Sequence, residues 1–301
     1  MTELADLTLA AAGDLLRRGQ TTSRDLTAAI LRRIEETEPR IHAYAHVYWE
    51  QSLTNAGDRD NELRRGRWRG PLHGIPIAVK DLLYTTDAPT EAGSDALKGW
   101  VPPFTATVVE KLRAAGAIIV GKTVTHELAY GVNEPPTRSP WGSNSYPGGS
   151  SAGSGASVAA RSAVGAIGTD TGGSIREPAS LNGLVGLKPT FGRVSRYGVV
   201  PLSPSLDHVG PMTRTVTDNA LMLSAIAGPD QADSGSIDVP VDDYLLNIDR
   251  GIHGMRIGID RRYFFDPTLQ PDVRNAVETV IAELEDAGAE IIDVSMPELD
   301  A

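Results

Sequence analysis

The stretch VVEKLRAAGAIIV at residues 108–120 places a helical pattern, an Ala-Gly-Ala turn and a strand-like apolar run directly after one another. The stretch VIAELEDAGAEII at residues 280–292 repeats this order, and the apolar run GIPIAVK at residues 74–80 precedes the first copy. Helices that alternate with strands are typical of α/β proteins, in which helices cover a central sheet. We therefore expect a helix over 107–115 and strands over 74–80 and 117–120.

The first part of the chain, residues 5–65, has apolar side chains at helical spacing. We expect Ser23 to cap a helix that continues to about Glu36, because a hydroxyl in the cap position accepts a hydrogen bond from a free amide of the first turn. This region shows no chemistry of its own. A further apolar run at residues 164–167 indicates another buried strand.

The composition excludes several classes of protein. The 301 residues are 41% hydrophobic and 22% charged, which is usual for a globular domain. The chain has no cysteine, so thiol catalysis, disulfides and cysteine zinc sites are ruled out. A net charge of −11 argues against nucleic acid or an anionic membrane as a main partner. The N-terminus lacks a signal-peptide pattern and no apolar run reaches the ~18 residues of a membrane span, so we expect a soluble, cytoplasmic protein.

A segment rich in glycine and serine, residues 147–173, interrupts the apolar patterning and marks the functional centre. Glycine at this density has an entropic cost, which indicates close backbone approach or positive φ angles. The spacing of Gly148 and Gly153 matches a phosphate loop, but Ser154 stands where that loop needs its lysine. A dinucleotide fingerprint would need a third glycine that is absent. We therefore expect no cofactor.

A nucleophile elbow is a second interpretation, because GSSAG at residues 149–153 fits G-x-S-x-G with Ser151 as the nucleophile. Asp207 with His208 or His253 would complete a triad in the right chain order. An elbow must follow a strand, however, and residues 141–147 are poor strand material because they contain glycine, asparagine and proline.

A third interpretation uses GTDTGGSIREP at residues 168–178, which directly follows the apolar run at 164–167. Ser174 comes after two glycines, where successive backbone amides can converge on one point. Such a point can bind the oxyanion that forms during acyl transfer. This loop therefore offers a candidate nucleophile together with its oxyanion hole.

At this point the sequence resembles the amidase signature enzymes. The resemblance is carried by separated blocks: PGGSSAGSGASVAA at 147–160, GTDTGGSIREP at 168–178, GLKPT at 186–190, GRVSRYG at 192–198, IAVKD at 77–81 and GPMT at 210–213. It implies an α/β fold with a mixed central sheet flanked by helices on both faces. It also implies a single domain over residues 1–301, with a helical region at 1–70, a catalytic core at 71–215 and an α/β tail at 216–301. Family members usually continue for about another third of their length, so the C-terminal part is expected to be missing.

The resemblance implies a Ser–cis-Ser–Lys triad in which Lys80 is the base, Ser150 the bridging serine and Ser174 the nucleophile. It places the oxyanion hole on the backbone of Thr171, Gly172, Gly173 and Ser174, with supporting roles for Ser151, Asp170 and Arg176. It also implies a cis peptide bond before Ser150. A lysine works as a base only when neutral, so its pKa of about 10.4 must fall by roughly 3 units, which burial can supply. Asp81 is adjacent in the strand and should point to the opposite face.

The activity implied is hydrolysis of a carboxylic amide to an acid and ammonia or an amine through an acyl-enzyme. Two alternatives stay open: the glutaminase (A) subunit of a tRNA-dependent amidotransferase, and a truncated relative without activity. The expected partner is a small amide substrate, with a homodimer as the default assembly. His126-Glu127 lacks a second histidine at metal-binding spacing, so no metal site is predicted.

Overall fold

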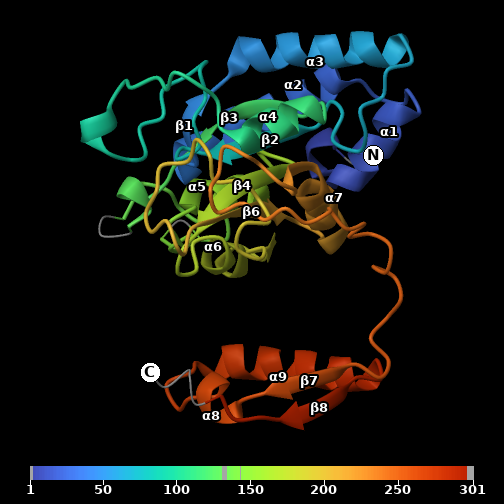
Figure 1. Ribbon diagram of the computed structural model, residues 1–301, viewed down its shortest axis with the longest axis vertical. Coiled ribbons are helices and arrows are strands. Elements are labelled where there is room, and N and C mark those ends of the chain that lie inside the picture. Colours follow the sequence, from blue (N-terminus) through green and yellow to red (C-terminus); the bar gives the residue numbers. More distant parts are fainter. Residues whose placement is uncertain (1–2, 131–133, 143, 297–301) are drawn as a thin grey trace. The chain divides into compact units, whose positions relative to one another are not determined.

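The computed structural model describes residues 3–130, 134–142 and 144–296. The chain divides into two compact units, Met1–Leu245 and Leu246–Ala301 (Figure 1). The division falls inside the tail that we expected at residues 216–301. The prediction that residues 1–301 form one domain stays a prediction.

The N-terminal region is helical, as expected, but one short strand interrupts it. Its elements are a 3-10 turn at Leu4–Asp6, α1 at Leu9–Arg17, α2 at Ser23–Ile41, β1 at Tyr44–Val47 and α3 at Trp49–Arg64. The prediction that Ser23 caps α2 was wrong. Thr22 is the cap and accepts a hydrogen bond from the Asp25 amide, whereas the Ser23 hydroxyl donates to the Gly74 carbonyl and ties α2 to the sheet.

The first unit contains a six-stranded sheet in the order β1-β3-β2-β4-β6-β5. The strands after β1 are β2 at Pro76–Lys80, β3 at Ile118–Thr123, β4 at Gly165–Asp170, β5 at Val185–Gly186 and β6 at His208–Thr213. β2 is parallel to both β3 and β4, whereas β1, β5 and β6 each pair antiparallel with a neighbour. The sheet is therefore mixed, and the strands predicted over 74–80, 117–120 and 164–167 lie at its centre.

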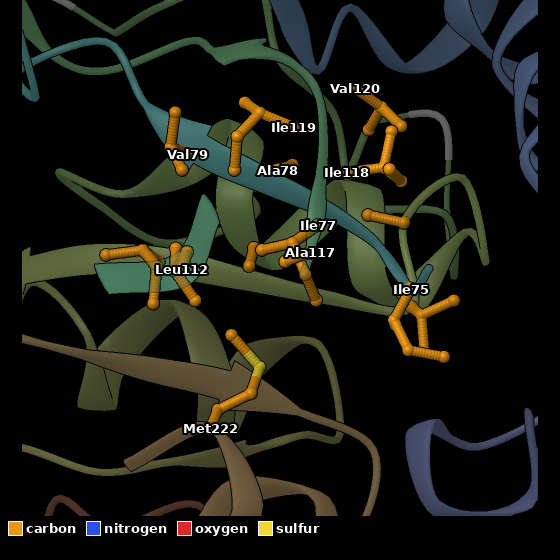
Figure 2. Packing of buried hydrophobic residues seen from close by; sticks show 14 of the residues in the cluster. Ile75, Ile77, Ala78, Val79, Leu112, Ala117, Ile118, Ile119, Val120 and Met222 are labelled. Carbon is orange, nitrogen blue, oxygen red and sulfur yellow. The ribbon is translucent and has the colours of Figure 1, made fainter. Parts of the chain in front are cut away.

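Helices pack on this sheet and form a continuous apolar core with it. Those that follow α3 are α4 at Thr107–Ala114, α5 at Ala152–Ala159, α6 at Arg176–Leu181 and α7 at Val216–Ile226, with 3-10 turns at Asp95–Leu97 and Glu127–Ala129. Figure 2 shows side chains of β2 and β3 gathered with Leu112 of α4 and Met222 of α7. Burial of such side chains supplies the main driving force that holds the central strands in place.

The second unit is a small β-α-β arrangement. It consists of β7 at Arg256–Ile259, α8 at Arg261–Phe264, α9 at Pro271–Asp286 and β8 at Glu290–Asp293, with β7 and β8 parallel. The helix and strand predicted from residues 280–292 are therefore confirmed. In the described ranges of both units, no helix is long and apolar enough to span a membrane.

The topology places the carboxyl ends of β2 and β4 side by side. Because β2 and β4 are adjacent and parallel, their carboxyl ends lie at the same edge of the sheet. Lys80 is the last residue of β2 and Asp170 is the last residue of β4. Functional groups commonly gather at this edge of open α/β sheets.

Candidate active site

Lys80 is a buried lysine without exposed surface at the end of β2. Its Nζ lies 2.8 Å from Ser150 Oγ and 2.7 Å from Thr169 Oγ1. Burial lowers the pKa of Lys80 well below its ordinary value, because the charged form loses its hydration; Asp170 and Asp207 oppose this more weakly. The lysine predicted as a base therefore meets a serine hydroxyl in an environment that favours its neutral form.

Ser150 and Ser151 occupy the turn that leads into α5. The peptide bond between Gly149 and Ser150 is cis, as the resemblance implied. The Ser150 carbonyl accepts a hydrogen bond from the His126 amide at 3.2 Å. The Ser151 hydroxyl donates to the Thr169 carbonyl at 3.1 Å and accepts from the Thr169 amide at 3.2 Å. Ser151 thus fastens the turn to β4.

The position of Ser151 does not suit the nucleophile-elbow interpretation. Its side chain is fully buried, and the described residues before it form turns and loop instead of a strand. The His208 ring makes its hydrogen bonds with the Leu206 carbonyl and the Lys188 ammonium. The structure therefore does not support Ser151 as an exposed nucleophile with His208 as its base.

The small residues of α5 allow unusually close backbone packing. A Cβ atom at Gly153 would lie 2.2 Å from the Ala43 carbonyl oxygen and 2.5 Å from the Val124 amide nitrogen. Real Cβ atoms do not approach so closely, so only glycine fits there. The glycine-rich sequence is thus explained by helix α5 lying directly against backbone, as its composition indicated.

Asp170 organises the loop that carries Ser174. Its carboxylate accepts hydrogen bonds from the amides of Gly173, Ile175 and Arg176 at 2.9, 3.1 and 3.3 Å. The Arg176 guanidinium adds two more, at 2.9 and 3.0 Å. Burial raises the pKa of Asp170, but the hydrogen bonds and the positive charge of Arg176 outweigh it and hold the pKa below its usual range. The two residues predicted as supporting therefore fix the loop in one conformation.

Ser174 lies in this loop and is partly exposed. Its carbonyl accepts a hydrogen bond from the Ser151 amide at 3.3 Å, which joins the two serine segments. Within the described part of the chain, the Ser174 hydroxyl has no hydrogen-bond partner, so its predicted link to Ser150 is not formed here. Lys80 and Ser150 are joined by a hydrogen bond, whereas Ser174 is tied to Ser151 through its backbone.

The backbone amides predicted for the oxyanion hole differ in their availability. The Gly173 amide is bound to Asp170. Over the described ranges, the amides of Thr171, Gly172 and Ser174 donate no hydrogen bond. Unpaired amides beside a candidate nucleophile are suited to stabilise developing negative charge.

Two residues that contact Lys80 or the serine turn were not identified from the sequence. Thr169 holds Lys80 through its hydroxyl and Ser151 through its backbone. His126 is buried and contacts the Gly149–Ser150 turn. The sequence could have pointed to Thr169, because it is a hydroxyl residue at the end of a predicted strand. The role of His126 depends on a loop contact that no local pattern indicates.

A cavity of about 290 Å³ borders the site. Thr169 and Thr171 form part of its wall. The Thr171 hydroxyl donates to Asp207 at 2.5 Å, and Asp207 also lines the cavity. The cavity therefore lies next to Thr169, which contacts Lys80, and next to Thr171, whose backbone amide is unpaired.

Comparison with known proteins shows the family of this chain. The Amidase family model matches residues 25–301. This chain belongs to the Amidase family. The predicted α/β fold with a mixed central sheet is likewise shared with solved amidase structures.

The similar proteins include enzymes with different names. The A subunit of the glutamyl-tRNA(Gln) amidotransferase of Geobacter metallireducens is 46% identical over 99% of this chain and 62% of its own length. The native peptide amidase of Stenotrophomonas maltophilia has a TM-score of 0.89 and 39% identity, covering 97% of this chain and 62% of that one. The corresponding amidotransferase protein of Thermotoga maritima has a TM-score of 0.87 and 34% identity, covering 100% of this chain and 64% of that one. The chain thus spans about three fifths of the length of these relatives.

Proposed function

We propose that this protein hydrolyses a carboxylic amide through an acyl-enzyme, with Ser174 as the nucleophile, Ser150 as the bridging serine and Lys80 as the base. The observation that carries the proposal is the 2.8 Å contact between Lys80 Nζ and Ser150 Oγ inside the protein. A neutral lysine accepts a proton there, and burial lowers the pKa of Lys80 in the direction that this role requires.

The reaction follows from this arrangement in two halves. Ser174 attacks the amide carbonyl carbon while its proton passes to Ser150 and the Ser150 proton passes to Lys80. The amides of Thr171, Gly172 and Ser174 stabilise the oxyanion. The carbon–nitrogen bond then breaks as the proton returns through Ser150 to the leaving nitrogen, which departs as ammonia or an amine.

The second half releases the acid. Water attacks the ester of Ser174 and gives up a proton along the same path, and the carboxylic acid leaves with Ser174 restored. Asp170 keeps the loop in place throughout, because its carboxylate binds the loop amides and is itself held by the Arg176 guanidinium.

A fluorophosphonate probe tests the proposal directly, since it reacts with activated serines. We expect labelling of Ser174, found by peptide mapping, and loss of labelling in Ser174→Ala and Lys80→Met. Circular dichroism of each variant confirms that it is folded. Label on Ser151 would support the nucleophile-elbow interpretation, and folded protein without any label would support the inactive relative.

A second candidate function is favoured by the identity of 46% with the A subunit of an amidotransferase. In that case the same triad would release ammonia from glutamine for use by a partner protein. Glutaminase activity that appears only with the partner proteins present would favour this function. Hydrolysis of a simple amide by the isolated chain would favour the amidase.

A further inference from the structure

One part of the wall of the cavity beside the Ser174 loop is apolar, and polar and charged side chains line the rest. We call this cavity the Val200 cavity; its lining includes Leu82, Ala129, Val199, Val200, Leu202 and Val209. Leu82 and Ala129 are buried and form a small cluster against which Val200 and Leu202 pack. At about 290 Å³ the Val200 cavity has room for a group of a few carbon atoms.

The arginine in the wall is already paired with one of the two aspartates there. Arg196 binds Asp233 through two nitrogens, at 2.8 and 3.2 Å, and its guanidinium lies 4.3 Å from the centre of the Phe191 ring. Both side chains are largely buried, with exposed fractions of 14% and 6%. An ion pair of this kind offers little attraction to a further charge, because each partner already satisfies the other.

Asp207 and His208 of the wall also form hydrogen bonds within the protein. Both oxygens of Asp207 accept hydrogen bonds, from the Thr171 hydroxyl and from the amides of Leu202 and Ser203. The two ring nitrogens of His208 contact the Leu206 carbonyl and the Lys188 ammonium. An anionic ligand entering the Val200 cavity would lose its hydration without gaining a free cation from the described wall, because Arg196 is paired and Asp207 adds a negative charge.

We propose that the Val200 cavity receives the acyl group of the substrate and selects an apolar one over an anionic one. This inference rests on the proposed amide hydrolysis. The Val200 cavity touches Thr171, whose free amide would face the carbonyl oxygen, so a group attached to that carbonyl reaches the apolar part of the wall. Glutamine carries a carboxylate that finds no free cation in the described wall, and by the same argument it is a poor substrate for this site.

The test uses anilides that share p-nitroaniline as the leaving group and differ only in their acyl group. We expect kcat/KM to rise at least about 10-fold from the acetyl to the hexanoyl anilide, since added methylenes in an apolar pocket give discrimination of this size. The 5-carboxypentanoyl anilide, whose chain has the same length but ends in a carboxylate, should fall back to the acetyl value or below. Glutamine should be hydrolysed more slowly than hexanamide.

Substitutions at Val200 assign the effect to the Val200 cavity. Val200→Phe should remove the preference for hexanoyl over acetyl, and Val200→Ala should move the preference toward longer chains. Val216→Phe is the matched control, because Val216 is 60% exposed at the start of α7. An unchanged hexanoyl preference in both Val200 variants would overturn the inference, as would efficient turnover of glutamine. The inference would also be overturned if the Val200 substitutions changed the hydrolysis of N-hexylacetamide and left that of hexanamide unchanged.

Binding separates this inference from the proposed function. Calorimetric titration of the Ser174→Ala chain with hexanamide and acetamide measures the Val200 cavity without turnover. Tighter binding of hexanamide that is lost in Val200→Phe would support the cavity even if no variant hydrolysed any amide, in which case the proposed function alone would fail. Equal binding of the two amides, with or without turnover, would overturn the assignment of the Val200 cavity.

Discussion

Asp81 forms an ion pair with Lys122, with Oδ1 and Nζ 2.8 Å apart, although Lys80 is its neighbour in the chain. Successive side chains of a strand point to opposite faces, so Asp81 turns away from the site that Lys80 enters. The second oxygen of Asp81 accepts hydrogen bonds from the amides of Glu91 and Ala92. Lys122 therefore supplies the counter-charge of a buried carboxylate away from Lys80, which can stay neutral.

Replacement of Lys122 by methionine should destabilise the protein by about 3–5 kcal/mol, because it leaves the buried Asp81 without its counter-ion. Urea unfolding measures this loss. Adding Asp81→Asn should restore part of it, since the charge is removed and an acceptor is kept. Lys98→Met, at an exposed lysine, is the control and should change stability little. Equal effects of the two lysine substitutions would contradict the ion-pair argument.

The pH dependence of hydrolysis should report the neutral form of Lys80. Because its pKa in the folded protein is lowered well below 10.5, the fraction of free base rises with pH through that lowered value. We expect kcat/KM to increase with pH and to level off well before pH 10.5. Lys80→Arg stays protonated and should lose at least about 10³-fold in activity. A rise in activity that continues to the ordinary lysine pKa would show that Lys80 is charged in the resting site.

The titration of Lys80 should also make the free energy of unfolding depend on pH. Between its lowered pKa and 10.5, the unfolded chain holds a proton that the folded chain does not. The free energy of unfolding should therefore rise with pH across this interval. Lys80→Met should lack that contribution, and the comparison of the two unfolding profiles isolates it from the other titrating groups.

Asp170→Asn should loosen the Ser174 loop. It removes the charge that binds Arg176 and weakens the acceptors of the loop amides. We expect a fall in kcat/KM of about 10²-fold, since small misplacement of reacting groups has effects of that order. Because the pKa of Asp170 is depressed, its stabilising effect is present above the unfolded pKa of the carboxyl group and is lost as pH falls through the folded value. The variant should show a weaker loss of stability in acid, measured by thermal unfolding.

Gly149→Ala should disturb the turn that presents Ser150. The added Cβ atom would lie 2.5 Å from His126 Cε1 and 2.6 Å from His126 Nε2, which is too close for either atom to stay. We expect activity to fall by about 10²-fold with a loss of roughly 1–3 kcal/mol in stability. His126→Ala in the same chain should recover much of the activity by removing the ring. Gly57→Ala, in an open position on α3, is the control.

Much of the fold could be predicted from local pattern. The central strands, helix α4 and the repeated helix–strand unit at 280–292 follow from apolar periodicity, which responds directly to burial. The short strand β1 was missed because its four residues have mixed exposure. The cap of α2 was misplaced by one residue, since three hydroxyl residues, Thr21, Thr22 and Ser23, stand in a row and the contact of Ser23 with Gly74 is not visible in the sequence.

The sequence by itself determined which residues carry the candidate chemistry: a lysine at the end of an apolar strand, the serines of a glycine-rich turn and a serine after two glycines. Their order in the chain and the sequence motifs around them are local properties. Only the tertiary structure decided how they meet. The parallel pairing of β2 with β4 brings Lys80 to Thr169, and the depressed pKa of Lys80 depends on burial by segments from across the chain. Desolvation, ion pairing and close backbone contact act between residues distant in sequence, which is why no local pattern reports them.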